Sequence, residues 1–193
     1  MMKKILFVIL MMCMSITVSA QQNVFRKAVA RYKNSVSVTA SVVKTTHKDA
    51  VTKDVVSKGN LTMKKPSEVS IVIGDGSDQL LMQGSAFTMV VKGKKHETSS
   101  ERNPQFASFQ TVFESILSGG AKDISALSDL TMSQKGNQLV LTITPKAEGK
   151  KAVKRMLFSS FVLTIDTQTS ELKSLRMNER AGYTEYMFSN FRF

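Results

Sequence analysis

The chain has one cysteine, no tryptophan, two histidines and three prolines among its 193 residues. The single cysteine, Cys13, excludes an intrachain disulfide, so the fold depends on a hydrophobic core or on oligomerisation. It also excludes zinc sites of the cysteine type. Acidic residues are scarce, 15 against 27 basic residues, and the formal net charge is +12. Such a surface suits anionic lipid head groups or acidic envelope polymers, or it only keeps the protein soluble.

Residues that carry catalysis or hold metals are equally sparse. His47 and His96 each lie in a polar, lysine-rich stretch that predicts a turn, whereas a histidine triad requires a buried imidazole oriented by a carboxylate. The segment Asp75–Asp78 resembles part of a calcium loop, but it lacks the ligand spacing and the closing glutamate of an EF-hand. An Asp- and Gly-rich turn explains it better. The sequence therefore predicts no enzyme activity, no catalytic residue, no metal site and no cofactor.

The N-terminus has the pattern of a secretory signal peptide. A basic start, Met1–Lys4, precedes the apolar run Ile5–Val18, and small residues follow up to Ala20. We expect residues 1–20 to be a signal peptide that is cleaved after Ala20, and residues 21–193 to form a single domain. Cys13 would leave with the signal. A location outside the cytoplasm makes nucleic acid an unexpected partner.

The stretch from Gly59 to Lys95 organises the rest of the chain. It predicts three β-segments, 59–63, 67–73 and 79–92, the last with a break at Gly84. Alternation with a period of two places apolar side chains on one face of the sheet and mixed side chains on the other. The residues expected on the apolar face are Val69, Ile71, Ile73, Phe87, Met89 and Val91.

Helices are predicted before and in the middle of the strands. The amphipathic pattern of Asn23–Tyr32 predicts a first helix. Asn103 as cap and Pro104 at the first position predict the start of a second helix, and Gly119–Gly120 ends it. A further short helix is predicted over Asp123–Leu130. The second helix has one apolar stripe, made of Phe106, Phe109, Phe113, Ile116 and Leu117.

The remaining apolar segments predict further strands joined by short turns. They are 35–45, 51–63, 130–134, 139–145, 161–166, 171–178 and 183–193. Sequential hairpins imply an antiparallel sheet, and a long twisted sheet curls so that helices cover its concave face. We therefore predict an α+β fold, mainly β: an open half-barrel of 8 to 11 strands with the helices over its concave face. Further residues expected on that face are Leu141, Ile143, Phe161, Leu163 and Met177.

Methionine is abundant, with 12 residues. Met82, Met89, Met132, Met177 and Met187 all fall in predicted strands, where a flexible thioether side chain fills irregular and adaptable apolar surfaces. Taken alone, the methionines are better explained by ordinary core filling. Combined with a phenylalanine-striped and nearly uncharged helix, the pattern favours an apolar cavity under a lid.

The order of these segments resembles the outer-membrane lipoprotein carrier protein (LolA) family over nearly the whole predicted domain. The collinear motifs are the opening helix with Phe25 and Tyr32, Gly59–Pro66, Leu81–Gly84 followed by Phe87, Leu141–Lys146, and the closing segments 161–166, 172–177 and 182–190. Two positions differ from the family pattern. Lys65 stands where the family commonly has an arginine linked to lid closure, and Gln83 replaces an aspartate.

The resemblance implies a periplasmic carrier that holds the acyl chains of lipoproteins in its cavity. Such a carrier would take lipoproteins from an inner-membrane ABC transporter to an outer-membrane acceptor, as a monomer, with Lys65 as the candidate for lid closure. Two alternatives stay open from the sequence. One is a secreted basic domain that binds anionic envelope surfaces without a cavity, and the other is a lipid-sensing protein on the same fold.

Overall fold

The structure is a computed structural model that describes residues 20–146 and 156–193. The predicted signal peptide therefore lies outside the described residues, apart from Ala20. The chain is helical over 20–28 and continues as the 3-10 helix η1 (Ala30–Asn34). The predicted helix Asn23–Tyr32 is thus present, with its last turn tightened into η1. Among the residues that the structure describes, no helix is long and hydrophobic enough to span a lipid bilayer.

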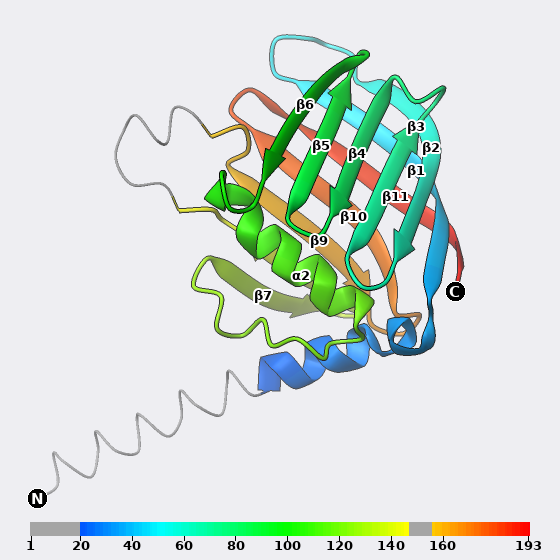
Figure 1. Ribbon diagram of the computed structural model, residues 1–193, viewed down its shortest axis with the longest axis vertical. Helices are drawn as coiled ribbons and strands as arrows, with labels where there is room; N and C mark the ends of the chain where they lie inside the picture. Colours follow the sequence, from blue (N-terminus) through cyan, green and yellow to red (C-terminus); the bar gives the residue numbers. More distant parts are fainter. Residues whose placement is uncertain (1–19, 147–155) are drawn as a thin grey trace, which may run out of the picture.

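Within the described residues, eleven antiparallel strands form one open sheet, which confirms the predicted fold class. Their order is β6-β5-β4-β3-β2-β1-β11-β10-β9-β8-β7. Every paired set of strands is consecutive in sequence except β1 with β11, and β6 and β7 form the two edges. The sheet curls until β3–β6 face β9–β11, as Figure 1 shows. The strands are β1 (Ser37–Lys48), β2 (Val55–Lys64), β3 (Glu68–Ile73), β4 (Asp78–Gln83), β5 (Ala86–Val91), β6 (Lys94–Ser99), β7 (Leu130–Lys135), β8 (Gln138–Ile143), β9 (Ser160–Asp166), β10 (Glu171–Glu179) and β11 (Gly182–Arg192).

The predicted middle helix is present but starts later than its sequence suggests. The 3-10 turn η2 (Pro104–Phe106) precedes α2 (Ala107–Leu117), and no side chain caps the N-terminus of α2. Asn103 uses its backbone carbonyl instead, which accepts a hydrogen bond from the Phe106 N–H at 3.0 Å. The predicted cap at Asn103 is therefore wrong, although the chain does turn there.

The predicted short helix over Asp123–Leu130 is wrong. The Asp123 carboxylate accepts hydrogen bonds from the backbone N–H and the hydroxyl of Ser125, and this local turn competes with a helix. Leu127 and Leu130 each donate only to a carbonyl three residues back, and Leu130 already belongs to β7. Ile124 is instead fully buried in an irregular connection.

Strand β6 was predicted as a polar turn, and it forms because β5 offers it a paired edge. His96 and Glu97 lie opposite Met89 and Thr88 in the register, although all of β6 up to Glu97 is exposed. His47 is likewise in β1 rather than in a turn. Edge strands with lysines are a common way to avoid edge-to-edge association.

The first helical segment closes one end of the half-barrel. The Tyr32 hydroxyl accepts a hydrogen bond from the Leu172 N–H at 3.1 Å, next to the bulge in the pairing of β10 with β9. Burial of this hydroxyl raises the pKa of Tyr32, so it stays neutral. Phe193 packs edge-on against Tyr32, with ring centroids 5.1 Å apart. The helix thereby satisfies a ladder group that the bulge would leave unpaired.

Candidate functional site: the concave face and its mouth

The concave face of the sheet is apolar because every second residue of the central strands points inward, and these residues are apolar. The register places Leu61 opposite Ile71, and Ile71 opposite Leu80, so three neighbouring strands contribute to one layer. The predicted cavity residues that lie in the single buried core cluster are Val69, Ile71, Ile73, Phe87, Leu141, Ile143, Phe161, Leu163 and Met177. These side chains pack together as a core, and Phe87 and Met177 lie where this core borders the cavities described below.

Helix α2 lies across the open side of the sheet, between the edge strands β6 and β7 (Figure 1). Phe109 joins the two halves of the sheet, since its ring lies 5.9 Å from that of Phe87 on β5 and 4.8 Å from that of Phe161 on β9. Phe106 stacks on Phe87 at 4.7 Å. All five residues of the predicted lid stripe are buried: Phe106, Phe109, Phe113, Ile116 and Leu117.

The C-terminus of α2 is fixed to the first helical segment. Gly120 N–H bonds to Ser115 O at 2.8 Å and Gly119 N–H to Ile116 O at 2.9 Å, the pattern of a Schellman cap. A Cβ atom added at Gly119 would lie 2.8 Å from the Cα atom of Lys33. The Arg26 Nε atom also donates to the Gly120 carbonyl at 3.3 Å. This end of the lid is therefore the anchored one.

Lys65, the predicted lid-closure residue, lies at the same anchored corner. It is exposed, in the turn between β2 and β3, and its ammonium donates to the Lys33 carbonyl. Lys33 is the residue against which Gly119 packs, so Lys65 reaches the end of α2 through one intervening residue. Within the part of the chain that the structure describes, Lys65 makes no hydrogen bond to α2 itself.

A cavity of about 560 Å³ opens at the other end of the concave face, and we call it the mouth cavity. Its apolar wall is formed by Val55, Met89, Val91, Leu157, Phe158 and Met177. An adjoining cavity of about 220 Å³ shares Met89, Leu157 and Phe158 and continues to Phe87 and Phe106 beneath the start of the lid. Both volumes together are in the range of small-ligand pockets. The concave face is thus packed in its centre and hollow at the mouth.

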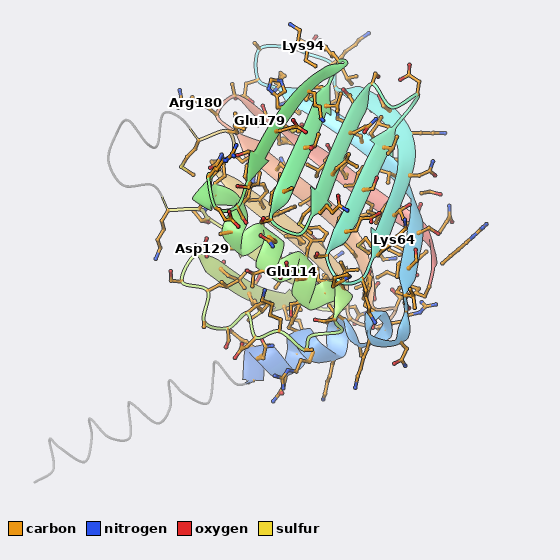
Figure 2. All side chains as sticks on the ribbon, in the orientation of Figure 1. Lys64, Lys94, Glu114, Asp129, Glu179 and Arg180 are labelled. Atoms are coloured by element: carbon orange, nitrogen blue, oxygen red, sulfur yellow. The ribbon has the colours of Figure 1, made fainter. Side chains whose placement is uncertain are left out.

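Charged residues line the mouth cavity as well, interspersed with the apolar ones. Lys44 Nζ lies 2.6 Å from Asp78 Oδ2, with only 12% and 24% of the two side chains exposed. Lys48 pairs with Glu179 across the sheet. Burial opposes ionisation of Asp78, but the hydrogen bonds from Lys44 and from the Lys92 N–H outweigh burial and lower the pKa of this carboxyl. Glu179 and Lys94 mark this end of the molecule in Figure 2, with Lys64 at the opposite end.

Two of the predicted cavity residues differ from the rest in burial. Met89 is half-buried and Val91 is 39% exposed, and both line the mouth cavity rather than the packed centre. The sequence prediction missed the charged residues of the mouth. The alternation of Val38, Ala40 and Val42 continues to Lys44 and Lys48, so period two already places both lysines on the inner face.

Neither histidine lines the mouth cavity, although His96 lines the adjoining cavity of about 220 Å³. His47 Nδ1 is 2.7 Å from Asp54 Oδ1, and its ring stacks on that of Tyr183 at 5.0 Å. Arg176 covers the same tyrosine ring at 3.5 Å, which makes a surface cluster. Among residues 20–146 and 156–193, no group of three or more His, Cys, Asp or Glu residues could hold a metal ion.

No known family model and no curated protein matches this chain. Among solved structures, it is similar to a DUF1329 family protein from Desulfovibrio piger, at 14% identity and a TM-score of 0.44 over 91% of this chain and 92% of the other. A LolA superfamily protein from Nitrosomonas europaea has 10% identity and a TM-score of 0.40 over 89% and 92% of the two chains. For the Mycobacterium tuberculosis lipoprotein LppX, the values are 14% and 0.40 over 90% and 95%.

Proposed function

We propose that this protein is a non-enzymatic carrier that holds the acyl chains of lipids or lipoproteins in the mouth cavity and beneath the lid. The mouth cavity of about 560 Å³ carries the proposal, because its methionine, valine and phenylalanine wall continues into the lid-covered apolar core. Burying an acyl chain contributes about 0.8 kcal/mol per CH₂ group. A chain of about 15 carbons therefore leaves a membrane slowly unless a protein offers it an apolar site.

The finer parts of the carrier role belong to the same proposal. They are a periplasmic location after cleavage at Ala20, action as a monomer, and exchange with an inner-membrane ABC transporter and an outer-membrane acceptor. The fixed C-terminus of α2 supports a lid that hinges at Gly119 and opens at its other end, near Phe106 and the mouth. In this scheme Lys65 holds the hinge side through its bond to Lys33.

Val91→Glu is expected to weaken binding of acyl ligands at least tenfold while the protein stays folded. Val91 lines the mouth cavity and is 39% exposed, so a carboxylate there remains hydrated until a ligand enters. Burying it beneath an alkyl chain then costs several kcal/mol. The measurement is binding of bis-ANS and its displacement by a triacylated lipopeptide, with circular dichroism to monitor folding.

Met187→Glu is the matched control, because Met187 lies on β11 with 56% exposure and lines none of the cavities described above. It introduces the same charge on the outer face and should leave dye binding unchanged. Equal loss in both variants would show that the dye senses net charge alone. Absence of saturable dye binding to the folded wild-type protein would overturn the proposed function.

A further inference from the structure

Buried ion pairs inside an apolar half-barrel need an explanation other than stability. The desolvation of two charges cancels most of their attraction, and well-packed apolar residues in their place are often as stable or more so. The Lys44–Asp78 pair is mostly buried and faces the same cavity as Met89 and Met177. Its position at the wall of a hollow points to a ligand rather than to the packing of the sheet.

The two carboxylates of the mouth have already engaged all of their oxygen atoms. Asp78 Oδ2 accepts from Lys44 at 2.6 Å and Oδ1 from the Lys92 N–H at 2.8 Å. Glu179 Oε2 accepts from Lys48, and Oε1 from the Thr184 hydroxyl at 3.3 Å. Each of these oxygens keeps a second lone pair, but a cationic group that used it would share the oxygen with a donor that is already bonded there.

The ammonium groups, in contrast, have donors to spare. A lysine ammonium has three N–H donors, and the described residues engage one on Lys44 and one on Lys48. Tyr186 lines the same cavity, and within residues 20–146 and 156–193 its hydroxyl has no hydrogen-bond partner. Burial raises the pKa of Tyr186, so its O–H stays a donor. The polar wall thus offers donors to a ligand.

The net charge of the cavity lining is positive, which also favours an anionic ligand. Three lysines, Lys44, Lys48 and Lys92, line the mouth cavity against the two carboxylates Asp78 and Glu179. A cationic head group would have to compete with Lys44 and Lys48 for the carboxylates. An anionic head group would instead add charge-assisted hydrogen bonds, which are stronger than neutral ones.

We propose that the mouth cavity binds a single-chain amphiphile with an acidic head group, a carboxylate or a phosphate monoester. The head accepts hydrogen bonds from Lys44, Lys48 and Tyr186, and the chain lies against Met89, Phe158 and Met177 toward the lid. This inference rests on the proposed function, because it names the ligand class of the same cavity.

The test compares four ligands with the same dodecyl chain and different heads. Dodecanoate, dodecyl phosphate, dodecyltrimethylammonium and 1-dodecanol are titrated into the purified protein below their aggregation concentrations, with calorimetry as the readout. We expect at least one of the two acids to bind about tenfold more tightly than the ammonium and the alcohol, since each charge-assisted bond is worth about that factor. Whichever of the two acids binds more tightly identifies the head group.

Lys44→Gln and Lys48→Gln are expected to reduce this preference about tenfold each, because glutamine keeps one N–H donor for the carboxylate and removes the charge. The Lys48 side chain is 43% exposed, so the second variant folds even if the first does not. Lys58→Gln makes the same change at an exposed position of β2 that lines none of the cavities described above, and should leave the preference unchanged.

The outcomes separate the two proposals. Equal affinity for all four ligands, or tighter binding of the ammonium, overturns the acidic head group and leaves the acyl-chain carrier in place. An acid preference that persists in both lysine variants also overturns it. Failure of all four ligands to bind overturns the carrier itself.

Discussion

Ile71→Glu is expected to unfold the protein at room temperature. Ile71 is fully buried in the centre of β3, between Leu61 and Leu80 of the neighbouring strands. A carboxylate there has no cation within the apolar layer, and an unpaired buried charge costs on the order of 5 kcal/mol or more. That loss is comparable with the whole stability of an ordinary domain. Far-UV circular dichroism and urea unfolding measure it.

Val72→Glu is the control for this change. Val72 is the next residue along β3 and points to the outer face, where it is half-exposed. We expect a loss below about 1 kcal/mol, as for most surface substitutions. Equal stability of the two variants would contradict the assignment of faces. For the same reason, a charge at Ile71 or Phe87 reports on the core, whereas a charge at Val91 reports on the cavity.

Gly119→Ala is expected to destabilise the protein by about 3 kcal/mol. Gly119 has a φ of +66°, in the left-handed region, where alanine costs about 1 to 2 kcal/mol. The added Cβ atom would also lie 2.5 Å from Lys33 Cβ and 2.8 Å from Lys33 Cα, so the backbone of η1 must move. The end of the lid and the first helical segment then separate, and the midpoint of urea unfolding falls.

Gly136→Ala isolates the backbone part of this effect. Gly136 has a φ of +57° in the β7–β8 turn, and no atom lies within 4 Å of the Cβ position. It should lose only about 1 kcal/mol. A loss at Gly119 no larger than the loss at Gly136 would contradict the close contact between the lid and η1.

The alternation of apolar and polar residues with a period of two predicts most of the fold. The alternation of Val69, Ile71 and Ile73 predicts an apolar face, and the phenylalanine stripe predicts the helix that covers it. Both signals are local and repeat several times, so sequence alone suffices for them. The eleven strands fall at the upper end of the predicted range.

The elements that the sequence did not predict are decided by pairing and hydrogen bonding rather than by the apolar pattern. β6 is polar and exposed, and it is a strand only because β5 pairs with it. The pattern Ile124, Leu127 and Leu130 has helical spacing, but a side-chain turn at Asp123 and the start of β7 at Leu130 divide it. The turn at Asp123 is local and competes with the helical spacing, whereas the start of β7 depends on its pairing with β8.

The hollow at the mouth could not be found from residue types alone. Val91 and Ile71 follow the same alternation, yet one lines a cavity and the other is sealed in the core. What distinguishes them is the position of α2, whose Phe109 packs against Phe87 and Phe161 in the centre, while the mouth cavity lies beyond this contact. Lys44 and Lys48 were predictable as inward residues, but their partners Asp78 and Glu179 come from strands far along the chain.

Methyl NMR of methionine-labelled protein tests the acyl-chain site most directly, because methionines lie at the mouth and on the outer face. Met89 and Met177 line the mouth cavity, whereas Met187 is 56% exposed on β11. Titration with dodecanoate should shift the methyl signals of Met89 and Met177 along one saturable curve and leave Met187 unchanged. Binding that shifts Met187 and leaves Met89 and Met177 in place would contradict an acyl-chain site in the mouth of the half-barrel.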